Sequence, residues 1–257
     1  MLHSLDPASD RPAYKQIADQ LRAAIKAGEF QPGLRLPSEA ELIAQFEVSQ
    51  GTIRQALNLL KSEGLVHSQQ GRGVFVRERP RIRRLASDRF LRRHRDEGKA
   101  AYLAESEASG VRPEVEVYFV GPSDAPEEIA GLLNLRRGAK VLVRRRRYLS
   151  NGHPTEMATS YIPWALAKGT AMVEPNPGPG GIYARLEEQG YRLERFKEEV
   201  GARMPSPEEV KALQLASGTP VLTLVRTAFA ADDKPVEVCD TVLAADLYRL
   251  DYDLPAR

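Results

Sequence analysis

The sequence predicts a mixed α+β protein made of two domains that are joined by a short basic segment. Helical spacing of apolar side chains, followed by two short strand patterns around glycines, marks residues 1–78 as one domain. Residues 87–257 contain a duplicated unit of one helix and one β-hairpin, which marks a second domain. Arginines crowd the segment 79–86 between them, so we predict a basic linker there.

The composition is that of an ordinary globular chain. Of 257 residues, 42% are hydrophobic and 28% are charged, and the net charge is +2. The single cysteine, Cys239, excludes a disulfide within the chain and a four-cysteine zinc site. The sequence holds no run of about 18 apolar residues, and residues 1–13 lack the apolar core of a signal peptide. We expect a cytoplasmic protein with no metal, no cofactor and no membrane partner.

Three helices are predicted in residues 1–78. Apolar residues at helical spacing predict the first helix over 14–25. Ser38 is the expected N-cap of the second helix, and Glu41 completes a capping box with it. Ser49 is the expected N-cap of the third helix, which Gly64 ends. The apolar stripe of this third helix consists of Ile53, Ala56, Leu57 and Leu60.

A glycine-tipped hairpin follows these helices. Residues 65–68 and 74–77 are predicted to be short strands, and the turn between them contains Gly71 and Gly73, which suit positive φ. Three helices and such a hairpin form a winged helix-turn-helix, in which the third helix reads the major groove of DNA. The alternative is a helical domain with a solvated polar face. The polar face of the third helix consists of Gln50, Gly51, Arg54, Asn58 and Lys61.

Gln50 and Arg54 lie one helical turn apart near the start of the third helix. An arginine there can contact guanine and a glutamine adenine, each through two hydrogen bonds. Backbone N–H groups at the starts of the second and third helices can bind phosphates. Arg72, at the tip of the hairpin, can enter a minor groove or touch a phosphate.

Residues 14–76 resemble the DNA-binding domain of the GntR family of transcriptional regulators. The motifs that carry the resemblance are Tyr14-Lys15-Gln16-Ile17, Leu34-Arg35-Leu36-Pro37-Ser38-Glu39, Thr52-Ile53-Arg54-Gln55-Ala56-Leu57, Glu63-Gly64-Leu65 and Gly71-Arg72-Gly73-Val74-Phe75-Val76. The resemblance implies DNA contacts by Arg35, Ser38, Glu39, Ser49, Gln50, Gly51, Thr52, Arg54, Gln55, Gly71, Arg72 and Gly73. Many relatives carry arginine in place of Gln50 and a basic or polar residue in place of Ala40, so we expect a different operator sequence.

The basic segment 77–84 holds five arginines and one proline. It is polar and extended enough for a linker, and it could also add non-specific phosphate contacts, so both interpretations stay open. The sequence assigns no structure to residues 85–110.

The second domain contains an internal repeat with an offset of 80 or 81 residues. The recurring motifs are Pro126-Glu127-Glu128-Ile129 with Pro207-Glu208-Glu209-Val210, Val141-Leu142 with Val221-Leu222, and Pro154-Thr155-Glu156 with Pro235-Val236-Glu237. We therefore expect two hairpins in one antiparallel sheet, with the repeated helices covering one face.

The first hairpin has a turn at Asn151-Gly152 that is typical of a two-residue loop. Such a turn predicts three facing pairs, Arg147 with Glu156, Arg145 with Ala158, and Val143 with Ser160. Because side chains alternate between faces, one face would carry Arg145, Arg147, Glu156 and Ser160. Arg144 and Arg146 are expected on the opposite, solvated face. Two guanidiniums on one face favour an anionic ligand, and the alternative is an exposed charged strand.

Residues 85–253 resemble the UTRA effector domain of the HutC subfamily of GntR regulators, whose fold is similar to that of chorismate lyase. The motifs are Arg147-Tyr148, Ser160-Tyr161-Ile162-Pro163, Gly181-Ile182-Tyr183 and Pro235-Val236-Glu237. The resemblance implies a small acidic metabolite bound by Arg145, Arg147, the backbone at Gly181 and Ile182, and Glu237. We expect Glu156, Ser160 and Tyr161 to complete this effector site. A glutamate common in relatives is Ala158 here, and Glu156 could substitute for it. The glycine-rich turn 178–181 could bind an anion through its N–H groups or be a plain loop.

These features predict a DNA-binding transcriptional regulator, specifically a repressor that binds a palindromic operator as a homodimer. Its effector is expected to be a small anion, either a phosphorylated sugar or a carboxylate. A competing interpretation is an enzyme of chorismate-lyase-like fold, against which the four histidines lack the spacing of a metal or catalytic site. One more interpretation stays open, a regulator that no longer binds an effector. A GntR regulator with an all-helical second domain is a further rival, and the two predicted hairpins argue against it.

Overall fold

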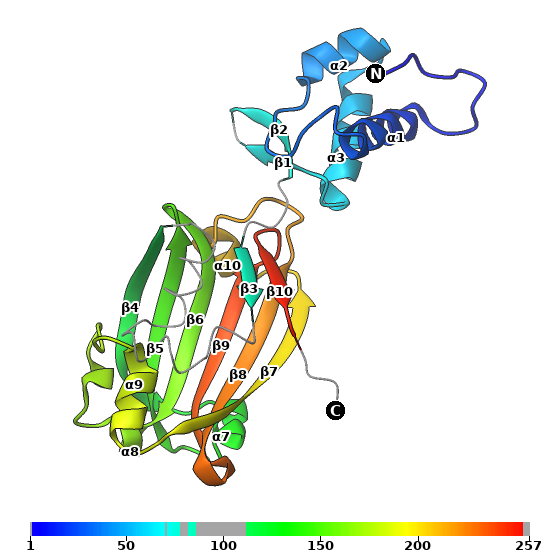
Figure 1. The fold of residues 1–257 in the computed structure, drawn as a ribbon. Helices are drawn as coiled ribbons and strands as arrows, with labels where there is room; N and C mark the ends of the chain where they lie inside the picture. Colours follow the sequence, from blue (N-terminus) through cyan, green and yellow to red (C-terminus); the bar gives the residue numbers. More distant parts are fainter. Residues whose placement is uncertain (1, 70, 78–81, 86–111, 254–257) are drawn as a thin grey trace. The chain divides into compact units, whose positions relative to one another are not determined.

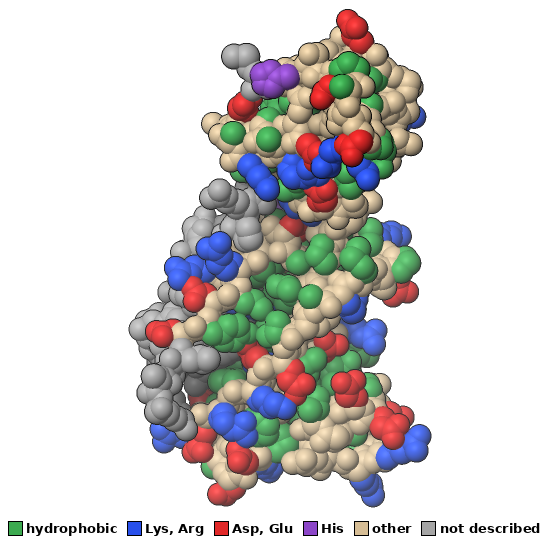
Figure 2. Space-filling model, turned by 90° about the vertical axis from the view of Figure 1, so that its right-hand side faces the viewer, with side chains coloured by type: hydrophobic (Ala, Val, Ile, Leu, Met, Phe, Trp, Pro, Cys, Tyr) green, Lys and Arg blue, Asp and Glu red, His purple; other side chains and the backbone are tan. Residues whose placement is uncertain are grey.

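The computed structural model describes residues 2–69, 71–77, 82–85 and 112–253 (Figure 1). The chain divides into two compact units. The first comprises Met1–Arg79 with Leu215–Thr219, and the second comprises Pro80–Gln214 with Pro220–Arg257. Acidic and basic side chains are interspersed on the face drawn in Figure 2, in keeping with the net charge of +2. Among the helices of the described residues, none is long and apolar enough to cross a membrane.

The first unit has the order helix, helix, helix, hairpin that the sequence predicts. Its elements are α1 (Ala13–Lys26), α2 (Glu39–Phe46), α3 (Gln50–Ser62), β1 (Val66–Gln69) and β2 (Gly73–Val76). The capping box at the start of α2 is confirmed, because Ser38 accepts from the N–H of Glu41 and the Glu41 side chain accepts from the N–H of Ser38. Ser49 caps α3 through the N–H of Thr52.

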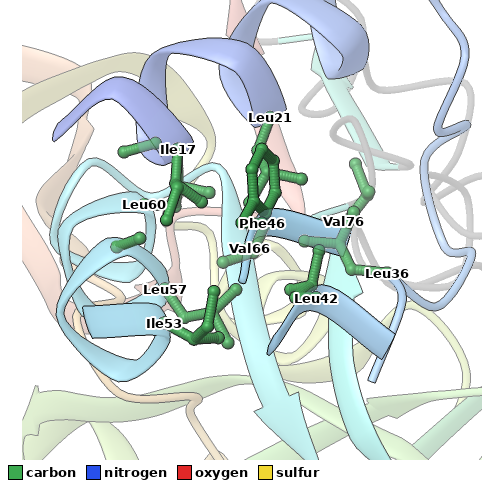
Figure 3. Packing of buried hydrophobic residues seen from close by; sticks show 12 residues of the cluster. Ile17, Leu21, Leu36, Leu42, Phe46, Ile53, Leu57, Leu60, Val66 and Val76 are labelled. Atoms are coloured by element: carbon green, nitrogen blue, oxygen red, sulfur yellow. The ribbon is translucent and has the colours of Figure 1, made fainter. Parts of the chain in front are cut away.

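One apolar cluster holds these helices and the hairpin together (Figure 3). Ile17 and Leu21 of α1 face the predicted stripe of α3, and Val66 and Val76 close the cluster from the hairpin. The side chains of Ile17, Leu21, Ile53 and Leu60 are fully buried. Because the core uses one side of α3, its other side stays available for a partner.

The second unit is a six-stranded antiparallel sheet with the order β4-β5-β6-β9-β8-β7. Its strands are β4 (Pro113–Asp124), β5 (Lys140–Ser150), β6 (His153–Pro163), β7 (Leu193–Arg203), β8 (Val221–Ala230) and β9 (Pro235–Ala244). Its helices are α7 (Glu127–Leu132), α8 (Trp164–Ala167), α9 (Gly181–Glu188), α10 (Pro207–Ala212) and the 3-10 turns η1 (Ala171–Val173) and η2 (Ala231–Asp233).

The predicted duplication is present in this sheet. The order β4, α7, β5, β6 recurs as β7, α10, β8, β9, and the two halves meet where β6 pairs with β9. On one face α7 packs against Val143 and Val238, and the carbonyl at the end of α10 accepts from Arg147. The helices α8 and α9 pack on the opposite face against Leu142 and Ile162.

The predicted register of the first hairpin is wrong by one residue. The turn Asn151-Gly152 forms with positive φ at both residues, and Ser150 pairs with His153 as expected. A β-bulge follows, because Leu149 pairs with Pro154 while Tyr148 pairs with Glu156, which leaves Thr155 as the extra residue. Pro154 has no N–H to donate to the ladder, which favours a bulge beside it. A one-residue slip sends every later side chain to the other face.

The second hairpin contains the same bulge. Phe229 pairs with Pro235 and Ala228 pairs with Glu237, so Val236 is the extra residue. The repeated proline therefore marks a repeated bulge, and both copies turn their glutamates, Glu156 and Glu237, toward the same face of the sheet as α9.

A short parallel ribbon lies beside this sheet. Strand β3 (Ile82–Leu85) pairs with β10 (Tyr248–Asp251), and Ile82 and Tyr248 are buried against Leu224 and Leu243. The prediction of a linker over 79–86 is therefore wrong for 82–85, because these residues form a strand of the second unit.

Candidate functional site

The exposed face of α3 carries the polar residues that the sequence places there. Gln50, Gly51, Arg54 and Asn58 are exposed, whereas Lys61 is half-buried. The Glu39 carboxylate, at the start of α2, accepts from Gln50 Nε2 at 3.0 Å and from Arg54 Nε at 3.1 Å. These hydrogen bonds, from Gln50 first and then Arg54, lower the pKa of Glu39. The carboxylate thus holds both side chains side by side on one surface.

The hairpin that follows α3 has a tip shaped by glycine. Gly71 and Gly73 have φ of 71° and 119°, values that side chains bearing a Cβ rarely adopt. A Cβ at position 73 would lie 2.7 Å from Nε of Arg35. The Arg72 guanidinium lies 5.8 Å from the centre of the Phe75 ring. Arg35 and Arg72 are therefore arranged around a tip that glycine permits.

The second unit contains a cavity of about 590 Å³ between the sheet and the segment that leads into α9. Its wall includes Arg144, Arg146 and Tyr148 of β5 and Glu156 of β6. Arg226, Glu237 and Cys239 contribute from β8 and β9, the second copy of the repeat. The cavity therefore lies where the two halves of the duplicated sheet meet.

Two arginines on this wall have no carboxylate partner in the described part of the chain. Arg144 is 1% exposed, and it donates to the carbonyl oxygens of Met172, of Glu174 at 2.6 Å and of Pro175 at 2.9 Å. Burial, followed by repulsion from Arg146, lowers the pKa of Arg144 to about 10, so Arg144 still carries its charge at neutral pH. Arg146 donates to Ser160 Oγ, and the Nε atoms of both arginines are buried without a hydrogen-bond partner.

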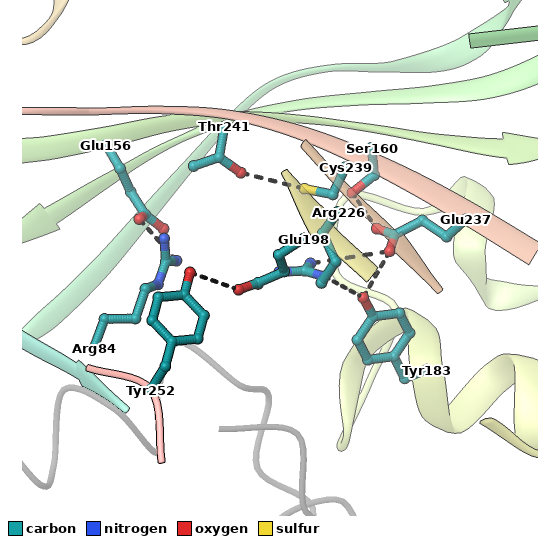
Figure 4. A network of polar contacts seen from close by, with 10 residues as sticks. All are labelled: Arg84, Glu156, Ser160, Tyr183, Glu198, Arg226, Glu237, Cys239, Thr241 and Tyr252. Atoms are coloured by element: carbon teal, nitrogen blue, oxygen red, sulfur yellow. Dashed lines mark hydrogen bonds and ion pairs between the residues drawn. The ribbon is translucent and has the colours of Figure 1, made fainter. Parts of the chain in front are cut away.

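Glu237 is the centre of a buried network (Figure 4). It accepts from Ser160 Oγ at 2.7 Å and from the Tyr183 hydroxyl at 2.6 Å. The Arg226 guanidinium lies 3.9 Å from the same carboxylate and donates to the Tyr183 oxygen at 3.0 Å. Burial raises the pKa of Tyr183 well above its usual value, which keeps its hydroxyl a donor. Glu237 thus has an ion pair with Arg226 and two hydroxyl donors, whereas neither Arg144 nor Arg146 forms an ion pair with a described carboxylate. Burial lowers the pKa of Arg146, but the nearby Tyr148, Cys239 and Glu237 outweigh burial and hold that pKa above its usual value.

The glycine-rich turn before α9 lines the same cavity. Gly178, Gly180 and Gly181 have φ of 88°, 74° and 67°. Gly180 is the N-cap of α9 and supplies no side chain to the first turn of the helix. The positive end of the helix dipole therefore faces the cavity together with two arginines.

Comparison with known proteins bears on both units. Residues 13–76 match the family model described as bacterial regulatory proteins, gntR family, and residues 108–249 match the UTRA domain. An HTH-type transcriptional regulator of Streptomyces coelicolor is 34% identical, with 96% of this chain and 94% of the relative covered. The chain belongs to the GntR family. It is a DNA-binding transcriptional regulator with a UTRA domain, and the enzyme interpretation is set aside.

Two further matches agree with this GntR assignment. The HTH-type transcriptional repressor NagR of Bacillus subtilis is 29% identical over 95% of this chain and 96% of its own. A crystal structure of a GntR-family transcriptional regulator has a TM-score of 0.66 and 31% identity, and covers 96% of this chain and 99% of that one. UTRA domains bind small-molecule effectors, so the cavity is the natural place to look for the effector of this GntR regulator.

The register of β5 corrects the predicted set of cavity residues. Arg145, Arg147 and Tyr161 lie on the face opposite the cavity. Arg145 lies 5.7 Å from the Phe119 ring centre, and Arg147 donates to Glu116 at 2.8 Å and to the Ala212 carbonyl at 3.0 Å. Tyr161 packs with the apolar cluster beneath α7. Arg144 and Arg146, predicted to be solvated, line the cavity instead.

The other predicted residues of the effector site do come together. Glu156, Glu237, Gly181 and Ile182 line the cavity, and Ser160 lies behind Glu237. The sequence reasoning missed Arg146 and Arg226. The repeat could have revealed them, because the two arginines occupy matching positions, opposite Ala158 and Cys239 respectively.

Proposed function

We propose that this GntR regulator is a homodimeric repressor that binds a palindromic operator and responds to a small anion held in the cavity. The observation that carries the effector class is the pair Arg144 and Arg146, two cationic side chains on a cavity wall with no carboxylate partner among the described residues. Three carbonyl oxygens meet part of the cost of burying Arg144, and nearby Glu237 meets part of the cost of burying Arg146. An anionic ligand in direct contact with the two guanidiniums would offset more of that cost.

Three features around the cavity fit a phosphate or carboxylate group. A guanidinium offers a planar pair of donors to either group. The uncapped start of α9 adds backbone N–H groups and the positive end of a helix dipole. The cavity volume of about 590 Å³ also leaves room for a polar body attached to the anion, as in a phosphorylated sugar or a small carboxylic acid.

The repressor and homodimer assignments rest on the DNA-binding unit and on relatives. One recognition helix per chain contacts one half-site, so a two-fold symmetric operator needs two chains. The NagR relative carries the word repressor in its name. Selection of bound sequences from a random library, combined with sedimentation of the free protein, tests both assignments. A non-palindromic consensus or a monomer bound to DNA would contradict them.

The test of the effector site is a comparison of neighbouring arginines. A thermal-shift screen of phosphorylated sugars and small carboxylates is run on the wild type, on Arg146→Gln and on Arg145→Gln. We expect Arg146→Gln to weaken binding of the best anion by about 1.5–3 kcal/mol, the scale of a charge-assisted hydrogen bond. Arg145→Gln, one residue away on the other face, is the matched control and should bind normally. If Arg145→Gln is the variant that loses binding, the anion site lies on the other face of the sheet.

A further inference from the structure

A buried ion pair ties strand β3 to the cavity wall (Figure 4). Arg84 Nη2 lies 3.0 Å from Glu156 Oε2, and the two side chains are only 3% and 2% exposed. Buried ion pairs contribute little net stability over apolar residues of the same volume, and breaking one partner is costly. A pair of this kind is therefore well suited to a contact that exists in one state and not in another.

The Glu156 carboxylate takes part both in the cavity wall and in the docking of β3. It lines the cavity, and it also holds Arg84 of β3. Its counterpart in the repeat, Glu237, bonds instead to Ser160 and Tyr183, which come from the sheet and from α9. Only the first copy of the repeat, among the described residues, has its glutamate joined to a strand outside the sheet.

The ribbon of β3 and β10 docks through the apolar cluster of Ile82 and Tyr248 with Leu224 and Leu243, and through polar side chains beside that cluster. Each of its two strands is four residues long, and isolated two-stranded ribbons are marginally stable. The Tyr248 hydroxyl donates to Thr155 Oγ1, the bulge residue beside Glu156, at 3.2 Å. Further along, the Tyr252 hydroxyl donates to Glu198 at 3.2 Å. Among the residues that dock the ribbon, Glu156 lines the cavity and Thr155 is its neighbour in the chain.

Strand β3 lies shortly after the DNA-binding hairpin in the sequence, so its docking sets how long the connection between the two units is. Ile82 follows Val76, the end of the DNA-binding hairpin, by six positions. While β3 is docked, residues 82–85 belong to the second unit. If β3 is released, those four residues join the connection between the units and lengthen its reach by about 13 Å.

We propose that the Arg84–Glu156 pair is the switch of this regulator, and that an occupant of the cavity with hydroxyl or ammonium donors competes with Arg84 for Glu156 and releases β3. The proposal rests on the proposed function, since it explains how effector binding reaches the DNA-binding unit. A longer connection lowers the effective concentration of the second DNA-binding unit at the second half-site. Release of β3 therefore weakens binding to a full operator and leaves binding to a single half-site unchanged.

The experiment compares hydrogen–deuterium exchange and DNA affinity in full-length variants without any effector. Glu156→Gln removes the carboxylate charge, and the double variant Arg84→Met/Glu156→Gln removes both charges of the pair. In Glu156→Gln, which leaves Arg84 buried without its counter-charge, we expect β3 and β10 amides to exchange about tenfold faster than in the wild type. The double variant leaves no buried charge unpaired, so its ribbon should exchange more slowly than that of Glu156→Gln. The affinities that follow are those expected of Glu156→Gln. Affinity for the selected full operator should fall about fivefold or more, with half-site affinity unchanged.

Arg83→Met is the matched control. Arg83 neighbours Arg84 on the same strand, but its ion pair with Asp251 is exposed, and exposed pairs contribute little. Its ribbon exchange and DNA affinity should match the wild type. A second arm adds glucose 6-phosphate as a donor-bearing anion. It should speed ribbon exchange in the wild type and leave exchange in Glu156→Gln unchanged, because that variant has no carboxylate at position 156 for the ligand to take from Arg84.

Two results overturn the switch: unchanged ribbon exchange in Glu156→Gln, or equal losses of full-site and half-site affinity in that variant. Equal acceleration in Arg83→Met also overturns it, because the ribbon would then respond to any substitution. Failure of the proposed function looks different. A wild-type protein that selects no palindrome contradicts the proposed function, while the exchange measurement still decides whether the pair holds β3.

Discussion

Arg146 and Arg226 occupy matching positions in the two copies of the repeat and line one cavity from different hairpins. Their surroundings have diverged. Arg226 donates to Tyr183 and lies 3.9 Å from both Glu198 and Glu237. Arg146 donates to Ser160 and has no ion pair with a described carboxylate. One copy of the repeated arginine therefore has carboxylates beside it that it stabilises, and the other is the one that we propose to bind the ligand.

This divergence predicts different costs of substitution. Arg226→Gln leaves Glu237 and Glu198 without their cation, so we expect the free energy of unfolding to fall by about 3–5 kcal/mol. Arg146→Gln breaks no ion pair with a described carboxylate, so its free energy of unfolding should fall by less. Urea denaturation of both variants measures the difference. Equal losses would mean that Arg146 is as deeply integrated into the fold as Arg226.

Arg54→Ala should weaken operator binding and leave the fold intact. Arg54 is 60% exposed on the polar face of α3, so its removal disturbs no core contact. The loss of one bidentate hydrogen-bonded contact to a base should cost about 1–3 kcal/mol of binding free energy. Arg11→Ala is a suitable control, because Arg11 is 56% exposed in the same unit and lies outside α3. A gel shift in which Arg54→Ala binds like the wild type would refute the base contact.

Gln50→Arg should change the preferred operator rather than simply weaken binding. Glutamine favours adenine and arginine favours guanine at base edges. The exposed Glu39 carboxylate already accepts from residue 50 and from Arg54, so it can also orient an arginine at position 50. Selection from a random library, carried out with both proteins, measures the preference. The same consensus from both would show that residue 50 touches no base.

Cys239 provides an internal probe of the cavity. It is the single cysteine of the chain and is 3% exposed on the cavity wall. The cationic wall should attract iodoacetate over neutral iodoacetamide, and the ratio of their rates should exceed that of the urea-unfolded protein by about tenfold. Mass spectrometry after timed labelling gives both rates. Arg146→Gln should lower the ratio, and a ratio equal to that of the unfolded chain would argue against a cationic cavity.

Tyr148 should keep its proton at pH values where an ordinary tyrosine loses it. Burial is the largest cause that raises the pKa of Tyr148 to about 12. Between pH 10 and about 12 the folded state holds this proton while the unfolded state releases it, so Tyr148 increasingly favours unfolding as pH rises through that range. The difference in 295 nm absorbance between wild type and Tyr148→Phe isolates this residue. Ionisation centred near pH 10 in the folded protein would contradict the shift.

The first unit can be predicted from sequence almost throughout because its signals are local. Caps at Ser38 and Ser49, the stripe on α3 and the glycines of the hairpin each act within a few residues. The cavity is predicted less well because it depends on strand register. The Asn151-Gly152 turn alone places Arg145 and Arg147 on the wrong face, and the repeated prolines are the local sign of the two bulges. Arg84 and Glu156 lie 72 positions apart in the sequence, so no local pattern predicts their ion pair.

The four consecutive arginines Arg144–Arg147 have a consequence for the folding of β5. A strand that slips by one residue would still present a pair of guanidiniums to the cavity and a pair to the other face. The charged side chains therefore favour the native register and the register shifted by one residue almost equally. Such a conflict between local alternatives is a form of frustration in folding. Besides the bulge that Pro154 favours, apolar residues at the far end of the hairpin select the correct alignment, where Leu142 meets Ile162 in the core. A polar substitution at either position should thus leave a mixture of two hairpin registers, not merely a weaker sheet.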